Sequence, residues 1–165
     1  MQNQNIYPLV TCGFTTFNSE NTIQKALTSA LNQDYKNIEI LIVDDNSTDL
    51  TLENIYKFLS TKKIRFRVVK HNSNLGVAQA RNTLLSNANG EFLAFFDSDD
   101  YSFKNRLSEQ LNHIILYENN NFNKSTTLWI DIERNKYRNW LSAGTHFVAV
   151  ATEERSELQG KHARP

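Results

Sequence analysis

The stretch "GEFLAFFDSDD", residues 90–100, decides the fold, because an apolar segment runs directly into a cluster of acids. Phe95 and Phe96 favour a buried position, whereas Asp97, Asp99 and Asp100 require water, a cation or a hydrogen-bond donor. A nearly continuous apolar run of this length is typical of a parallel strand that helices cover on both faces. We therefore expect a buried strand whose carboxyl end carries a polar site.

Three other short segments have the same character, at residues 9–17, 38–45 and 65–71. They are rich in β-branched and aromatic residues and bounded by polar ones, as strands are. Apolar stripes with helical spacing follow each strand, and we expect them to face the core. The alternation of strands and helices predicts an α/β fold with a mostly parallel sheet and helices on both faces. The predicted stripes contain Ile23, Ala26, Leu27, Ala30 and Leu31; Leu52, Ile55, Tyr56 and Leu59; Val77, Ala80, Leu84 and Ala88; and Leu107, Leu111, Ile114 and Ile115.

The composition limits the class of partner. Lys and Arg number 18, as do Asp and Glu, so the net charge is zero, and we expect no nucleic-acid partner. The single cysteine, Cys12, is expected in the core. No apolar run approaches the roughly 20 residues that span a bilayer, and the N-terminus lacks a signal-peptide pattern. These features predict no membrane span, and a location in the cytoplasm or peripheral to the inner face of the membrane.

The segments that follow the four predicted strands are all polar: "TTFNSEN", "DDNSTD", "HNSNLG" and "DSDD". In parallel α/β sheets, ligands bind beyond the carboxyl ends of the strands. We therefore expect these four segments to meet at one edge of the sheet and to form the functional site.

The acids of "DSDD" have two possible roles. Mg²⁺ and Mn²⁺ take oxygen ligands and commonly use one or two carboxylates together with substrate phosphates. The segment is therefore interpreted as an open metal site that a diphosphate would complete. The alternative is a solvated loop, in which Asp99 or Ser102 caps the following helix.

Two other strand ends carry candidate residues. Asp44, nearest the end of its strand, is positioned to accept hydrogen bonds from a ribose or a base, whereas Asp49 is expected to cap the next helix. Arg81 lies one turn into the helix that begins near Gly76, where it either holds the carboxylates together or contacts a phosphate. No Gly-x-Gly-x-x-Gly turn and no Walker motif occurs, so phosphate would be bound mainly by metal and cation.

Taken together, three stretches resemble the family 2 glycosyltransferases, which have the GT-A fold. They are "TTFNSENTIQKALTSALNQDYKNIEILIVDDNSTDLT" (residues 15–51), "NLGVAQARN" (74–82) and "GEFLAFFDSDD" (90–100), and the resemblance covers roughly residues 8 to 118. It implies transfer of a sugar from a UDP-sugar or another nucleotide-diphospho-sugar to an acceptor hydroxyl, on a saccharide or a lipid-linked acceptor. The family usually inverts the anomeric carbon and uses a divalent cation, here Mn²⁺ or Mg²⁺.

The resemblance also assigns roles to individual residues. In the nucleotide-sugar site, Thr15 and Phe17 would form part of the base and ribose pocket, with Glu20 beside them. Asp44 would bind the nucleobase, and Arg81 would lie near the nucleotide and its phosphates. In the acidic motif, Asp97 would lie on the ribose side, Ser98 would border the donor, and Asp99 would bind the metal, with Asp97 as a second ligand.

The C-terminal part departs from the family pattern. We expect a nucleotide-diphospho-sugar-binding domain at residues 1–120 and a divergent or truncated segment at 121–165, because few residues remain for an acceptor-binding half. The catalytic base is not identified; Glu153 and Glu154 are weak candidates, as are Asp131 and Glu133. The alternative to an active transferase is a non-catalytic nucleotide-sugar-binding domain or partner subunit. A phospho-accepting signalling domain would need a lysine after a later strand, and none is clearly placed.

Overall fold

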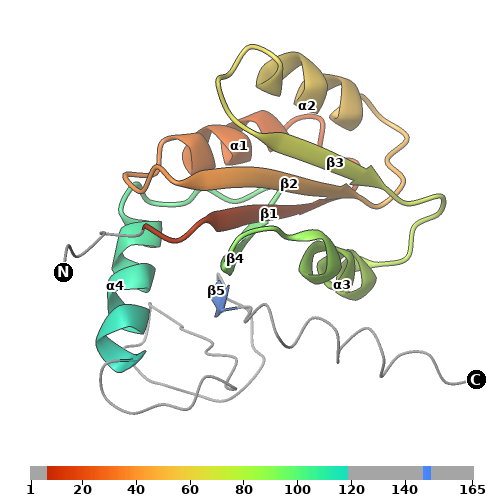
Figure 1. Cartoon of the computed structure of the whole chain (residues 1–165). Helices are drawn as coiled ribbons and strands as arrows, with labels where there is room; N and C mark the ends of the chain where they lie inside the picture. Colours follow the sequence, from red (N-terminus) through yellow and green to blue (C-terminus); the bar gives the residue numbers. More distant parts are fainter. Residues whose placement is uncertain (1–6, 119–146, 150–165) are drawn as a thin grey trace, which may run out of the picture.

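The computed structural model describes residues 7–118 and 147–149 (Figure 1). Within these residues, five strands form one sheet in the order β3-β2-β1-β4-β5. The first four strands pair in parallel, and β5 is antiparallel to β4. The strands are β1 (Val10–Thr16), β2 (Ile38–Asp44), β3 (Phe66–Lys70), β4 (Phe92–Asp97) and β5 (Phe147–Ala149).

Helices cover both faces of the sheet, as Figure 1 shows. One core contains residues of α1, α2 and α4, and the other contains residues of α3. Among the described residues, no helix combines the length and the apolarity needed to cross a membrane. The helices are α1 (Ile23–Leu31), α2 (Thr51–Leu59), α3 (Val77–Asn87) and α4 (Arg106–Glu118).

The two cores follow from the alternation of side chains along each strand. In β2, Ile40 and Ile42 pack in the α1 core, while Leu41 and Val43 pack in the α3 core. Gly13 of β1 faces α3, and a Cβ placed there would lie 2.7 Å from Leu93 Cδ1 and 3.1 Å from Leu84 Cδ1. The absence of a side chain at Gly13 therefore allows α3 to pack close to the sheet.

The predicted α/β class, with a mostly parallel sheet and helices on both faces, is confirmed. Cys12 is fully buried, as expected. Two residues of the predicted apolar stripes are not in the core: Tyr56 is 49% exposed and Val77 is 57% exposed. Val77 is the first residue of α3 and lines the hollow described below. The candidate bases Glu153, Glu154, Asp131 and Glu133 lie outside the described residues.

Candidate functional site

A hollow of about 330 Å³ lies at the carboxyl ends of β1, β2 and β4. This is where ligands bind in open α/β sheets, beside the point at which the strand order reverses. Here β2 and β4 flank β1 on opposite sides. The residues that line the hollow are Thr15, Thr16, Phe17, Asp45, Asn74, Gly76, Val77, Ala80, Asp97, Ser98 and Asp99.

Strand pairing explains why Thr15 and Asp97 meet in this hollow. They are paired in the register of β1 and β4. Both have the parity of the residues that face α3, since Phe95 of β4 packs in the α3 core. The hollow is consequently bounded by the sheet edge on one side and by the start of α3 on the other, through Gly76, Val77 and Ala80.

The acidic motif borders the hollow with accessible oxygens. The Asp97 side chain is 42% exposed, and its Oδ1 lies 3.3 Å from Nη2 of Arg81. The Ser98 hydroxyl lies 2.8 Å from that of Ser19, which joins the β4 end to the loop after β1. Asp99 is exposed and lines the hollow, so all three residues of "DSD" border the same space.

Arg81 is next to the hollow but does not line it. Besides the contact with Asp97, its guanidinium lies 5.7 Å from the centre of the Phe95 ring. Of the two roles expected for Arg81, the structure without ligand contains the first, a link to a carboxylate of the motif. Contact with a phosphate stays a prediction.

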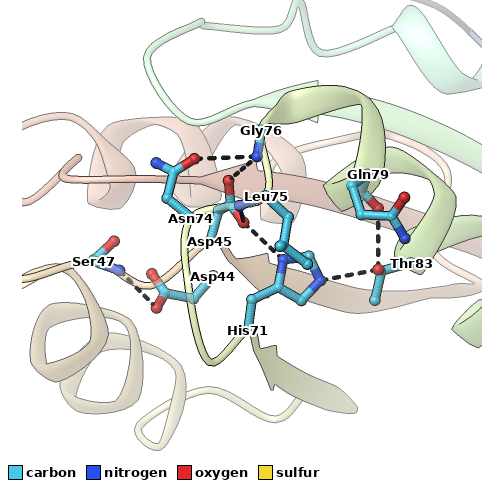
Figure 2. Close-up of polar contacts among 9 residues, drawn as sticks. All are labelled: Asp44, Asp45, Ser47, His71, Asn74, Leu75, Gly76, Gln79 and Thr83. Carbon is cyan, nitrogen blue, oxygen red and sulfur yellow. Dashed lines mark hydrogen bonds and ion pairs between the residues drawn. The ribbon is translucent and has the colours of Figure 1, made fainter.

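Asp44, the last residue of β2, and Asp45, the next residue, make separate sets of hydrogen bonds (Figure 2). Asp44 is fully buried and accepts a hydrogen bond from the Ser47 amide through Oδ2. Asp45, one residue later, lines the hollow. The reason is the alternation along the strand: Asp44 shares its face with Ile40 and Ile42, which lie under α1 and α2. Asp45 therefore lines the hollow and Asp44 does not. A contact between Asp44 and a nucleobase stays a prediction.

Asp45 also fixes the loop that precedes α3. Its Oδ1 accepts hydrogen bonds from the Leu75 amide at 2.8 Å and from His71 at 2.7 Å, and its Oδ2 accepts one from the Gly76 amide at 2.7 Å. Burial raises the pKa of Asp45, but these hydrogen bonds outweigh it and hold the pKa below its ordinary value. Asp45 is therefore ionised at neutral pH.

The remaining predicted residues divide between the hollow and its support. Thr15, Phe17 and Ser98 line it, and Phe17 is 46% exposed. Glu20 does not line it, because its carboxylate accepts a hydrogen bond from the Leu50 amide. Asp49 accepts hydrogen bonds from the amides of Glu20 and Thr51, consistent with the structural role expected of it.

Sequence reasoning missed Asp45, Asn74 and Gly76 as residues of the hollow. The alternation along residues 38–45 could not choose between Asp44 and Asp45, because both faces of this strand are apolar and covered by helices. Asn74 and Gly76 were recognised only as a polar turn. Their place at the hollow depends on how α3 packs against β1 and β2.

The carboxylate oxygens at the hollow suit a hard divalent cation whose other ligands are waters and phosphates. Among residues 7–118 and 147–149, no group of three or more His, Cys, Asp or Glu side chains could hold a metal. Asp97 and Asp99 both line the hollow and together supply two carboxylates. Mg²⁺ and Mn²⁺ need no more than one or two protein carboxylates when waters and substrate phosphates complete the shell. The residues present therefore fit such an ion bound together with a diphosphate.

The sequence of this chain is similar to those of proteins named as glycosyltransferases. "UDP-Glc:alpha-D-GlcNAc-diphosphoundecaprenol beta-1,3-glucosyltransferase WfaP" of Escherichia coli is 44% identical over 103 residues, which are 62% of this chain and 40% of WfaP. An uncharacterized glycosyltransferase of Haemophilus influenzae is 36% identical over 108 residues, which are 66% of this chain and 43% of the relative. The chain thus spans less than half the length of these curated relatives.

Solved structures agree with the fold. A crystal structure of S. aureus TarS in complex with UDP matches 93% of this chain and 48% of that chain, with a TM-score of 0.67 and 26% identity. A mannosyltransferase from Pyrobaculum calidifontis, in complex with GDP-Man and Mn²⁺, gives a TM-score of 0.70 at 19% identity over 96% of this chain and 48% of that one. At that identity the second likeness concerns the fold alone. Together the likenesses confirm the GT-A-like fold that the sequence predicts.

The family model described as "Glycosyl transferase family 2" matches residues 12–156. The match includes every strand end that borders the hollow. It also extends past residue 118, near which the resemblance described from the sequence ends. Since it covers well over half of the 165 residues, this chain belongs to glycosyl transferase family 2.

Proposed function

We propose that this chain forms the donor-binding part of a glycosyltransferase that moves a sugar from a nucleotide-diphospho-sugar to an acceptor hydroxyl, with inversion and with Mn²⁺ or Mg²⁺. One observation carries the proposal: the hollow contains three carboxylates, Asp45, Asp97 and Asp99, beside an exposed aromatic ring, Phe17. Carboxylates alone would repel a diphosphate, so a cation must accompany it. The relatives named as glycosyltransferases and the TarS complex with UDP support the same conclusion.

Different residues of the hollow would contact the nucleoside and the sugar of the donor. Phe17 and Thr15 would contact the nucleoside. Oδ2 of Asp45 accepts a hydrogen bond from the Gly76 amide and has a second lone pair, which would accept a hydrogen bond from the nucleobase. We propose Asp45 in the nucleobase role that the sequence assigned to Asp44. Ser98 would border the sugar or the ribose, held in place by Ser19.

Asp97 and Asp99 would hold the divalent cation, which when bound offsets the negative charge that develops on the departing diphosphate. Arg81 would keep one oxygen of Asp97 oriented and would add positive charge beside the phosphates. The hollow would also hold the anomeric carbon in reach of the acceptor oxygen, and this proximity contributes to the rate.

The acceptor is proposed from the sequence resemblance and from the name of one relative. A saccharide or a lipid-linked acceptor is expected; the name of WfaP refers to a diphosphoundecaprenol acceptor. Action on such an acceptor would bring the protein to the inner face of the membrane from the cytoplasm. The boundary near residue 120 and the base candidates Glu153 and Glu154 stay predictions.

The test is calorimetric titration of the full chain with UDP and with GDP, each in the presence and absence of Mn²⁺. Metal-dependent binding of one nucleotide is the expected result. Asp99→Asn should weaken that binding by at least about tenfold while leaving the melting temperature nearly unchanged, because Asp99 is exposed and stabilises little. The alternative role of Asp99 as a helix cap is wrong, because the next helix, α4, begins only at Arg106. If Asp99→Asn lowers the melting temperature and leaves binding intact, Asp99 supports the fold and does not hold the metal.

Asp100→Asn is the matched control, since it removes the same charge one residue further on. Asp100 is exposed and does not line the hollow. Its variant should retain metal-dependent binding. Transfer to an acceptor, or hydrolysis of the donor, separates an active transferase from a non-catalytic binding domain. Failure of a folded wild-type chain to bind either nucleotide would contradict the proposal.

A further inference from the structure

His71 lies directly behind the hollow without lining it, at the end of β3 (Figure 2). It is only 9% exposed, and both ring nitrogens have partners. Nδ1 lies 2.7 Å from Asp45 Oδ1, and Nε2 lies 2.9 Å from Thr83 Oγ1. The ring therefore connects the acid at the end of β2 to the middle of α3.

Both partners of His71 are themselves held by other hydrogen bonds. Asp45 is a carboxylate that already accepts two amide hydrogens, from Leu75 and Gly76, so Nδ1 donates to it. The Thr83 hydroxyl lies 3.0 Å from the Gln79 carbonyl, to which it donates. His71 is therefore one link in a chain of hydrogen bonds that runs from the loop at residues 72–76 through Asp45 to α3.

We propose that His71 is a positioning residue which, through its hydrogen bonds to Asp45 and Thr83, holds Asp45 and the loop at residues 72–76 in the shape that receives the nucleotide. The inference rests on the proposed function and deepens it. Asp45, Asn74 and Gly76 all line the hollow, and all belong to this hydrogen-bond network. Charge-assisted hydrogen bonds of this kind are stronger than neutral ones, so the network makes the donor pocket rigid before ligand binds.

Groups from β2, β3 and α3 surround the His71 ring. From β2, the groups that face it are the Asp45 carboxylate and the Asp44 carbonyl, which accepts from the His71 amide. The Asp44 carboxylate is directed to Ser47 instead. From α3, Thr83 and Gln79 contribute uncharged groups. Lys70 precedes His71 in β3 and is exposed to solvent, where its charge is screened.

The direct test is ¹⁵N NMR of the histidine rings of the ligand-free full chain, with His71→Asn used to assign the His71 signals. A protonated Nδ1 that is hydrogen-bonded to Asp45, with the Leu75 and Gly76 amides protected from exchange, is expected. An Nδ1 without a proton, or rapid exchange of the two amides, would overturn the inference. This readout needs neither nucleotide nor a stable variant.

Titration with UDP or GDP, whichever the wild type binds, and Mn²⁺ then tests the consequence. His71→Asn retains a donor to Asp45 but loses the link to Thr83, and should bind the nucleotide roughly tenfold more weakly. Thr83→Val should weaken binding in the same direction, and Thr83→Ser should restore it. In a transfer assay the donor KM should change more than kcat.

The outcomes separate the two proposals. If the wild type binds nucleotide and both His71→Asn and Thr83→Val bind it equally well, the positioning role is wrong and the proposed function stands. If the wild type binds no nucleotide, the proposed function fails, and with it the role of His71 toward the donor.

Discussion

At the scale of single residues, Glu39 is a buried charge at the opposite end of the sheet from the hollow. Its carboxylate accepts hydrogen bonds from the Thr11 hydroxyl at 2.8 Å and from the backbone and side-chain nitrogens of Asn89 at 3.0 and 3.1 Å. Burial raises the pKa of Glu39, but these bonds and the nearby Arg67 lower it below its ordinary value of 4.5. The residue joins β1 and β2 to the turn before β4.

Glu39→Gln should therefore destabilise the fold by about 2 kcal/mol, because charge-assisted hydrogen bonds are lost and an amide faces the donors of Asn89. The folded-state pKa is lowered, so the contribution of Glu39 is complete above its unfolded pKa and is lost as the pH falls through the folded value. Urea unfolding of wild type and variant should thus converge in acid.

Glu53→Gln on the exposed side of α2 is the control for this prediction, and should change the free energy of unfolding little. A difference between wild type and Glu39→Gln that persists unchanged at low pH would contradict the electrostatic explanation. Metal-dependent nucleotide binding should survive in Glu39→Gln, since Glu39 does not line the hollow.

At the scale of elements, the start of α3 is defined by Gly76, which precedes the helix with φ +84° and ψ 161°. L-residues with a side chain rarely adopt this region. The same conformation directs the Gly76 amide to Asp45 and Asn74, so one backbone position both begins the helix and completes the loop at the hollow.

Gly76→Ala should lower the free energy of unfolding by about 1–3 kcal/mol through backbone strain alone. No atom lies within 4 Å of the added Cβ, so a steric clash does not contribute. Thermal denaturation measures the effect, with the exposed Ser86→Ala on the same helix as the control. An unchanged melting temperature would show that the loop relaxes freely, and would also weaken the proposed rigidity of the donor pocket.

At the scale of the whole molecule, Cys12 reports on the integrity of the sheet. It is fully buried in the central strand β1, and burial raises the pKa of its thiol to about 12. Since the thiolate is the reactive form, the native protein should react with thiol reagents only after the sheet opens.

The measurement is the rate of labelling of Cys12, the single cysteine, at increasing urea concentration. The rate should rise in parallel with global unfolding followed by circular dichroism. Rapid labelling in the absence of urea would mean that β1 separates from its neighbours on its own, and would contradict the description of β1 as the centre of one cooperative sheet.

Much of this fold is predictable because local pattern and global packing agree. The near-continuous apolar runs require cover on both faces, and the helical stripes supply it, so the parallel sheet follows from composition and period. Two residues of the predicted helical stripes are exceptions. Val77 of α3 lines the hollow, and Tyr56 of α2 is exposed.

The sequence by itself determined the strand order along the chain, the burial of Cys12 and the meeting of Thr15, Phe17 and Asp97 at one edge, because parallel strands bring their carboxyl ends together. Only the tertiary structure showed that Asp45, and not Asp44, lines the hollow, and only it brought His71 to Thr83. Those outcomes depend on the face of the sheet to which each side chain is directed and on the place where α3 packs, and contacts between elements distant in sequence fix both.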